Sequence, residues 1–375
     1  MMISARIRLA VSAAGLLAAA IIWHGCDNPG GFDISTTTIP NRVVAYYSPQ
    51  EPPMNDPRNK IWDKALTGAI TVGDSADSAL PNYFGKSVVY LKAIKTPSRL
   101  YLRAEWGDAT RNIDPNGIVS IVTITYDTIT TNPLDIDTIR ETTWERRLSY
   151  VVIVGPDGNT EIRYDQDRLA VLWDMGDNDP EKADCRSMCH DATHLSTLGH
   201  RMYTTGGGHV DLWHWQAATS DPVQLAVDEY WDASGRVPDE QISPIATGNY
   251  DAVKQQPLYS HRDTTAFADT ILHFEDAVAF RDSILWPNRY EIPGFVVYDN
   301  ASGSIANVSA FSGYSKSSLG NRWTVIMSRA LTTGNVDDRD FSAIDAGDSV
   351  MVTIAVMNNA DRFHSGSAPF YIKFP

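Results

Sequence analysis

The chain has 375 residues, an ordinary apolar content and a formal net charge of −15 at pH 7. This length is enough for one large domain or two medium ones, and the composition excludes wholesale disorder and a polytopic membrane protein. The acidic charge argues against nucleic acid as a partner and favours a basic protein partner, attracted by long-range electrostatics.

The N-terminus has the pattern of an export signal. Two arginines precede an apolar, small-residue run from Leu9 to Trp23, which is too short for a comfortable membrane span. Cys26 follows, so we expect cleavage before it and lipidation of its thiol, with ordinary signal cleavage as the alternative. Residues 26–42 are rich in Gly, Ser and Thr and predict a flexible tether, which leaves residues 43–375 as the folded domain.

Strand signals dominate the chain after the tether. The runs 87–93 and 99–106 flank a Pro-Ser turn and predict a hairpin. The runs 118–129 and 138–154, joined through an Asn-Pro pair, predict a longer hairpin that projects from the domain. A short strand is expected at 168–175.

A second group of strands follows in the C-terminal half. In 210–215 the alternation puts Trp213 and Trp215 on one face and Leu212 and His214 on the other. Further strands are expected at 292–298, 305–311, 322–330, 349–357 and 370–374.

Little else in the chain is periodic. Residues 216–262 are Asp- and Pro-rich and predict an irregular excursion, while 56–65 and 275–285 predict short helices. The fold class we predict is therefore all-β: a two-sheet antiparallel β-sandwich with long irregular loops and a few short helices.

The segment with the most distinctive chemistry contains Cys185, Cys189 and His190. In the haem-attachment signature C-x-x-C-H, two thiols add to the haem vinyl groups and the histidine becomes an axial iron ligand. The spacing here, C-x-x-x-C-H, is one residue longer. The surrounding residues 177–208 are polar and Gly-rich, as expected of a loop wrapped around a cofactor. The alternatives are a local disulfide, or a metal site that joins His190 to a later histidine.

Several segments, taken together and in order, resemble one known family. They are similar to motifs of the haem-binding domain in the gamma subunit of ethylbenzene dehydrogenase and related type II members of the DMSO reductase family. The resemblance covers nearly all of the chain after residue 43. The segments are Asp56–Ala65, Tyr101–Thr110, Asp211–Trp215, Arg322–Leu331 and Asp337–Phe341.

The resemblance implies a β-sandwich that holds one haem and acts as an electron-transfer subunit or cytochrome, without transforming a substrate itself. Its redox partner would be a molybdenum-containing oxidoreductase or a basic cytochrome. In the gamma subunits the haem is bound non-covalently by a methionine before the tryptophan strand and a lysine near the C-terminus. Because this sequence adds Cys185, Cys189 and His190, we expect a branch with one covalent haem c.

The expected axial ligands follow from the same comparison. His190 is the expected proximal ligand, and Met202 stands where the family's methionine would fall. His364 is the rival sixth ligand, because it lies close to the family's C-terminal lysine position. The remaining possibilities are His194, His200, His209 or an open site. Trp213 and Trp215 are expected to pack on the porphyrin or in the core beside it, and Arg201 and Arg329 are candidates for pairing with the haem propionates.

Two functions from different classes are consistent with the sequence. The first is a lipid-anchored c-type cytochrome in the periplasm or at the cell surface, which transfers single electrons. The second is an exported β-sandwich lipoprotein that binds carbohydrate or protein, with Cys185 and Cys189 joined as a disulfide. A metal hydrolase is disfavoured because the sequence contains no H-E-x-x-H motif.

Overall fold

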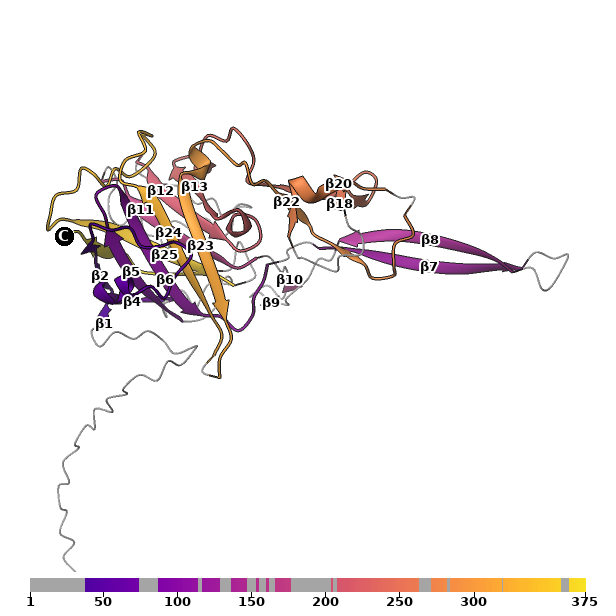
Figure 1. Cartoon of the computed structure of the whole chain (residues 1–375), viewed down its shortest axis with the longest axis horizontal. Coiled ribbons are helices and arrows are strands. Elements are labelled where there is room, and N and C mark those ends of the chain that lie inside the picture. Colours follow the sequence, from indigo (N-terminus) through magenta and orange to yellow (C-terminus); the bar gives the residue numbers. More distant parts are fainter. Residues whose placement is uncertain are drawn as a thin grey trace, which may run out of the picture.

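The structure is a computed structural model that describes residues 38–73, 87–113, 117–128, 136–146, 153–154, 160–161, 166–176, 204, 208–262, 271–281, 284–318, 320–358 and 364–375. Its body is one 15-stranded, mainly antiparallel sheet (Figure 1). In sheet order the main path is β1 (Thr38–Pro40), β4 (Thr67–Val72), β5 (Ser87–Lys95), β6 (Arg99–Gly107), β24 (Arg322–Ala330), β23 (Val308–Ser315), β13 (Leu225–Asp232), β12 (Val210–Gln216), β11 (Arg168–Asp174), β25 (Ser349–Met357), β27 (Phe370–Lys373) and β2 (Arg42–Val44). Beside this path β3 (Tyr46–Tyr47) pairs with β5, β14 (Gly235–Pro238) with β13, and β26 (His364–Gly366) with β25.

The long sheet folds back on itself, so that its two halves face each other and enclose the core. The halves are joined by a short pairing between β13 and β23, in which Leu225 lies opposite Ser309. At the other end β2 packs against β4 so closely that a Cβ on Gly68 would lie 2.6 Å from the Arg42 carbonyl oxygen. The all-β, two-layer prediction is confirmed, and the layers are the two halves of one nearly closed, barrel-like sheet.

The core lies between these halves because the inward positions of the strands are apolar. Val89, Leu91 and Ala93 alternate along β5 and are buried in the main apolar cluster, and the inward residues of β6, β24 and β25 join them. Burying each such side chain stabilises the fold by roughly 1–3 kcal/mol, which makes this cluster the main source of stability.

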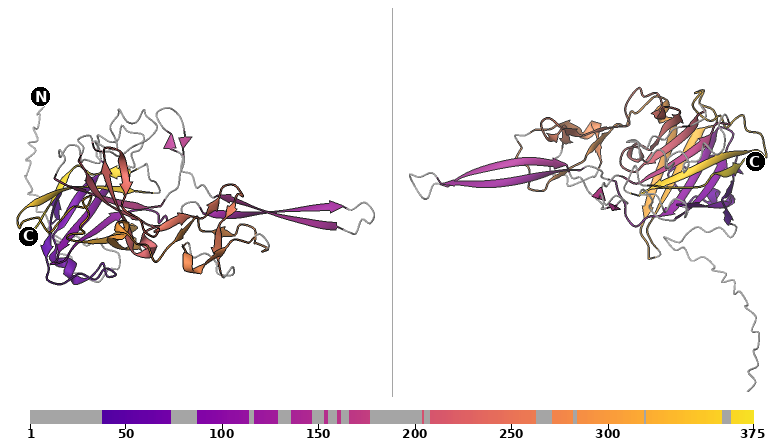
Figure 2. Two further views of the ribbon diagram at one scale, coloured as in Figure 1. Left: turned by 90° about the horizontal axis from the view of Figure 1, so that it is seen from above. Right: turned by 180° about the vertical axis from the view of Figure 1, so that it is seen from behind.

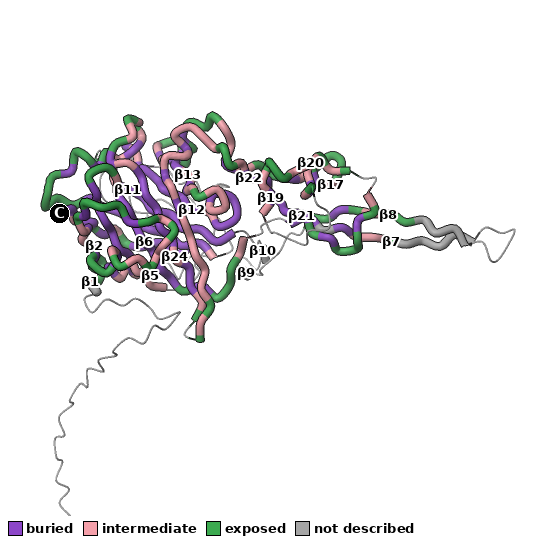
Figure 3. Tube along the Cα trace, in the orientation of Figure 1, coloured by how far each residue is buried: buried purple, intermediate pink, exposed green. Residues whose placement is uncertain are grey.

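The predicted long hairpin is confirmed and projects away from the sheet body (Figure 2). It is formed by β7 (Ile118–Thr128) and β8 (Ile136–Arg146), and β21 (Glu291–Ile292) pairs with β7 at its base. A separate apolar cluster around Trp144 and Trp286 is buried at this base. Figure 3 shows this small buried group beside the much larger one in the sheet body.

Short elements fill the rest of the described chain. The remaining strands are β9 (Ile153–Val154), β10 (Thr160–Glu161), β15 (Ala246–Gly248), β16 (Tyr250–Asp251), β17 (Gln256–Pro257), β18 (Tyr259–His261), β19 (Leu272–His273), β20 (Ala277–Ala279) and β22 (Phe295–Val297). The 3-10 turns are η1 (Lys60–Lys64), η3 (Asp221–Val223), η4 (Phe274–Asp276) and η5 (Ser304–Ala306). Across the described ranges, no helix has the length and apolar character that crossing a bilayer requires.

Two local predictions are wrong. Residues 216–262 were expected to be irregular, but they contain β13, a full strand of the main sheet, together with β14. The helix expected at 275–285 is replaced by η4 and by β20, which pairs with β18. In both places, pairing with another strand determines the secondary structure, and it overrides the preference of the local sequence.

Candidate functional site

The two tryptophans of β12 point into the core. Trp213 packs at 5.0 Å from Trp173, and Trp215 packs at 5.0 Å from Trp323, measured between ring centroids. The indole N–H of Trp215 also donates to Asp221 at 2.8 Å. The predicted alternation of β12 is thus observed, and Trp215 links the two halves of the sheet through its contact with Trp323 on β24.

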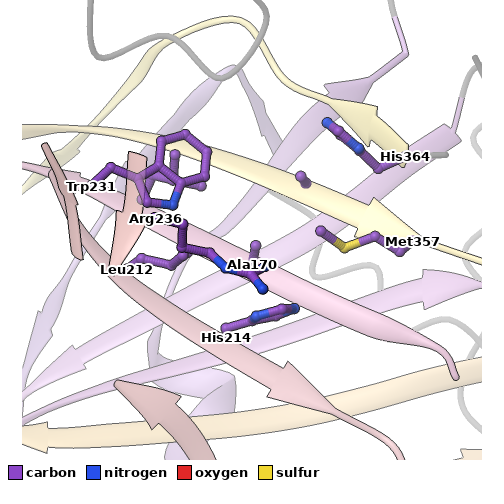
Figure 4. Close-up of a pocket in the computed structure, with 9 residues that line it drawn as sticks. Ala170, Leu212, His214, Trp231, Arg236, Met357 and His364 are labelled. Carbon is purple, nitrogen blue, oxygen red and sulfur yellow. The ribbon is translucent and has the colours of Figure 1, made fainter. Parts of the chain in front are cut away.

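The opposite face of β12 carries a small pocket of about 10 Å³, which has room for about one water molecule. The pocket forms where two neighbouring strands carry small side chains. Ala170 on β11 lies opposite Ala355 on β25, and on its other side it lies opposite His214 on β12. The pocket is lined by Ala170, Leu172, Leu212, His214, Trp231, Arg236, Ala355, Met357 and His364 (Figure 4). Most of these residues belong to a second buried apolar cluster, distinct from the core between the halves.

His214 is held in a fixed orientation at this pocket. Its Nδ1 lies 3.1 Å from an oxygen of Glu229 on β13, and both side chains are buried. Burial lowers the pKa of His214, which favours the neutral imidazole. Burial raises the pKa of Glu229, but the hydrogen bond to His214 and nearby positive charges bring it below its usual value, which favours the carboxylate. Nδ1 also lies 3.3 Å from the side-chain amide nitrogen of Gln216. In the tautomer that donates its Nδ1 proton to the Glu229 carboxylate, the lone pair of His214 is on Nε2.

The Nε2 atom of His214 is buried and, among the residues that the structure describes, has no hydrogen-bond partner. An imidazole anchored through one nitrogen by a carboxylate, with the other nitrogen presenting its lone pair, is the usual arrangement of a metal-ligating histidine. An orphaned acceptor in an apolar pocket costs free energy, so the arrangement favours a ligand at this nitrogen.

His364 reaches the same pocket from another strand. It opens β26 and lies opposite Met357 of β25 in the sheet register. Figure 4 shows the rings of His364 and His214 on either side of Met357. The lining thus contains two imidazoles, a thioether and the guanidinium of Arg236 around an apolar floor, and imidazole and thioether are side-chain groups that can ligate haem iron.

The volume of the pocket limits what the described residues can do alone. Cofactor sites commonly enclose about 300–1,000 Å³, whereas the described residues enclose about 10 Å³. These residues therefore do not enclose a haem by themselves, and they could form only one wall of its site, with an apolar surface and imidazole donors.

Most of the residues that the sequence singled out lie outside the described residues. This group comprises Cys26, Cys185, Cys189, His190, Met202 and the alternatives His194, His200 and Arg201. His209 is described and packs near Tyr230 at the start of β12, and it does not line the pocket. His364 does line it. Sequence reasoning missed His214 as a site residue, although the alternation of β12 had already placed it opposite the tryptophans.

A buried ion-pair network lies beside the core tryptophans. Arg329 on β24 is 0% exposed and bonds Asp211 on β12, Asp228 on β13 at 3.2 Å and Asp338 at 2.9 Å. Its guanidinium also lies 5.1 Å from the ring centroid of Trp213. Arg329 therefore holds the join between the two halves, and these three carboxylates compete with any pairing between Arg329 and a haem propionate.

The fold and the site define an all-β protein of two facing layers, with an imidazole-lined pocket on the outer face of one layer. A sequence model described as "Ethylbenzene dehydrogenase" matches residues 59–368. The match spans most of the chain, so this chain belongs to the ethylbenzene dehydrogenase family. The family-level resemblance found in the sequence is confirmed.

Other comparisons are less informative. No curated protein matches the chain. Among solved structures it is similar to a "putative carbohydrate-binding protein" from Bacteroides uniformis ATCC 8492, with 7% sequence identity, 90% of each chain covered and a TM-score of 0.32. A similarity this low carries no argument about function.

Proposed function

We propose that this protein is an exported c-type cytochrome that carries single electrons on one covalent haem and is anchored to a membrane through Cys26. Membership of the ethylbenzene dehydrogenase family supports a role alongside an oxidoreductase. The observation that supports the haem assignment is the pocket, where Glu229 anchors His214 over an apolar floor and the buried Nε2 of His214 has no hydrogen-bond partner among the described residues.

Each part of the proposed site has a distinct task. Cys185 and Cys189 would hold the haem through thioether bonds, and His190 would be the first axial ligand. When bound, the haem supplies one-electron chemistry. The apolar floor of the pocket excludes water, which tunes the reduction potential, and Glu229 fixes the tautomer and orientation of His214.

The second axial ligand is, in this proposal, an imidazole from the pocket rather than the thioether of Met202. His364 stands near the position of the family's C-terminal lysine, and it lines the pocket. His214 is the other candidate because of its anchored Nδ1. A pair of imidazoles gives a lower potential than a histidine and methionine pair, because a methionine ligand raises it.

The acidic chain would meet a basic redox partner. Because this chain has a formal charge of −15, we expect the partner to have a positively charged docking surface and the association rate to fall as the salt concentration rises. A basic cytochrome or a subunit of a molybdenum-containing oxidoreductase would fit this description.

Mass spectrometry of the peptide that contains Cys185 and Cys189 tests the proposal. We expect the peptide to carry the mass of one haem, and we expect the double variant Cys185→Ser/Cys189→Ser to release its haem into acidified organic solvent. Cys26→Ser is the matched control, because it removes the third thiol and should keep the haem. A peptide that lacks haem and is lighter by two hydrogens would establish a disulfide instead, and would favour the carbohydrate- or protein-binding lipoprotein.

Spectra of alanine variants should identify the second axial ligand. We expect either His214→Ala or His364→Ala to convert the haem from low spin to high spin, because removal of an axial imidazole leaves the iron five-coordinate. Met202→Ala should retain the low-spin spectrum. His273→Ala is the control, since His273 lies on β19 and bonds Asp299, away from the pocket. A change in Met202→Ala alone would assign the thioether and remove the pocket from the ligand set.

A further inference from the structure

A second group of acidic side chains lies next to the Arg329 network. Asp239, Asp337 and Asp338 each offer a carboxylate oxygen, and these atoms lie within 4.8 Å of one another. Asp239 directly follows β14 in one half of the sheet, whereas Asp337 and Asp338 lie in the loop after β24 in the other half. The group therefore bridges the two halves.

Among the described residues, Arg329 pairs with one member of this group, Asp338, and bonds neither Asp239 nor Asp337. Its Nη atoms are engaged by Asp211, Asp228 and one oxygen of Asp338. The other oxygen of Asp338 accepts from Thr333 and Asn335. The side chain of Arg339 is directed elsewhere, donating to the carbonyl oxygen of Met175.

Asp239 is the member of the group that most needs a ligand. It is 4% exposed, and among the described residues neither of its carboxylate oxygens has a hydrogen-bond partner. Burial and then the charges of Asp337 and Asp338 raise the pKa of Asp239 to about 7. A buried carboxylate without a donor destabilises the fold unless a cation or a proton compensates its charge.

We propose that Asp239, Asp337 and Asp338 bind one Ca²⁺ ion at the join between the two halves of the sheet. Ca²⁺ takes six to eight oxygen ligands at about 2.3–2.6 Å in flexible geometry, and carboxylate oxygens that all lie within 4.8 Å of one another are close enough to share one such ion. Mg²⁺ demands near-ideal octahedral geometry and usually keeps several waters, so a group of three protein carboxylates suits Ca²⁺ better. The donors are all carboxylates, which disfavours zinc and copper.

The ion has a structural role that is independent of the haem. It links β14 to the loop after β24, and it holds Asp338, which also bonds Arg329. Backbone carbonyl oxygens and water would complete the six to eight oxygen ligands that Ca²⁺ prefers. Binding to the folded chain alone stabilises it by mass action, so the melting temperature depends on the Ca²⁺ concentration.

Calorimetric titration of the chelator-treated, haem-loaded full chain with CaCl₂ tests this proposal. We expect one Ca²⁺ per chain and a melting temperature several degrees higher in CaCl₂ than in EDTA. Asp239→Asn should weaken binding by roughly tenfold to a hundredfold, as loss of a supporting metal contact commonly does. Asp345→Asn is the matched control, because Asp345 is exposed and lies outside the group.

The sign of the stability change distinguishes a bound cation from a shared proton. Asp239→Asn removes a buried charge, so it should be at least as stable as the wild type in EDTA but less stable than the wild type in CaCl₂. If the wild type shows no heat of binding and no shift in melting temperature at millimolar CaCl₂, the proposal is wrong. Binding to Asp239→Asn as tight as to the wild type would also overturn it. If that variant does not fold, Asp337→Asn, at a half-buried position, is subject to the same criteria.

Discussion

Replacing Arg329 with methionine is expected to destabilise the protein by about 3–5 kcal/mol, which is the usual cost of removing one partner from a buried ion-pair network. Arg329 is fully buried and is bonded to three carboxylates from different parts of the chain. Methionine preserves much of the volume but leaves Asp211, Asp228 and Asp338 without their shared cation. Urea unfolding at pH 7 measures the loss, provided that the m-value is unchanged.

The pH dependence of this variant identifies the cause of the loss. Burial raises the pKa of Asp211 to about 6 even though Arg329 lowers it. A raised pKa in the folded state means that this state binds more protons than the unfolded chain, so stability falls as the pH rises through that window. Without Arg329 the pKa of Asp211 in the folded state is higher still, so stability continues to fall up to a higher pH. We therefore expect a smaller deficit at about pH 5 than at about pH 8.

Exposed Arg58 provides the control for this experiment. Arg58→Met makes the same chemical change on the surface, where substitutions usually alter stability by less than about 0.5 kcal/mol. A deficit in Arg329→Met that is equally small, or that does not change with pH, would show that the network contributes little to the fold.

The sequence was sufficient for elements whose pattern is local. β5 and β6 alternate apolar and polar residues around a Pro-Ser turn, and β7 and β8 are long β-branched runs, so both hairpins were predicted. The two-layer class followed from the number of such runs. The closure of one sheet into two facing halves was not predictable, because it depends on the short β13–β23 pairing and on the close approach of β2 to Gly68.

β13 was missed because its buried positions include acidic residues. Asp228 and Glu229 argue against a buried strand when they are read locally. In the fold, Asp228 pairs with Arg329, which is 101 residues away, and Glu229 anchors His214 on the neighbouring strand. These pairings are long-range, so neither partner could be assigned from spacing. The same fact explains why His214 did not stand out as a site residue.

The family motifs gain a physical explanation from the same network. Asp211, Arg329 and Asp338 come from three separate segments that carried the resemblance, and the fold brings them into one ion-pair network beside Trp213. The role of these motif residues is therefore to hold the two halves of the sheet together. The residues that face the proposed haem lie on the other side of β12.

Filling the pocket is expected to displace the haem from its axial ligand. Ala170 lies on the pocket floor between His214 and Ala355, so the phenyl ring of Ala170→Phe would occupy the space above it. Overpacking costs about 1–3 kcal/mol, and about 1.4 kcal/mol corresponds to a factor of ten. We therefore expect the equilibrium constant for ligation to fall by about fivefold to about 150-fold. If the proposed haem is present, we expect it to stay attached through its thioethers, to become high spin and to bind carbon monoxide.

The control for this variant is Ala279→Phe, which places the same ring at an exposed position of β20. It should keep the wild-type spectrum and exclude carbon monoxide. The melting temperature of each variant, measured by circular dichroism, separates displacement of the haem from loss of the fold. If folded Ala170→Phe keeps a low-spin haem that excludes carbon monoxide, then the outer face of β11 and β12 does not contact the porphyrin. The second iron ligand would then come from another part of the chain, and this conclusion would hold even for a covalently bound haem.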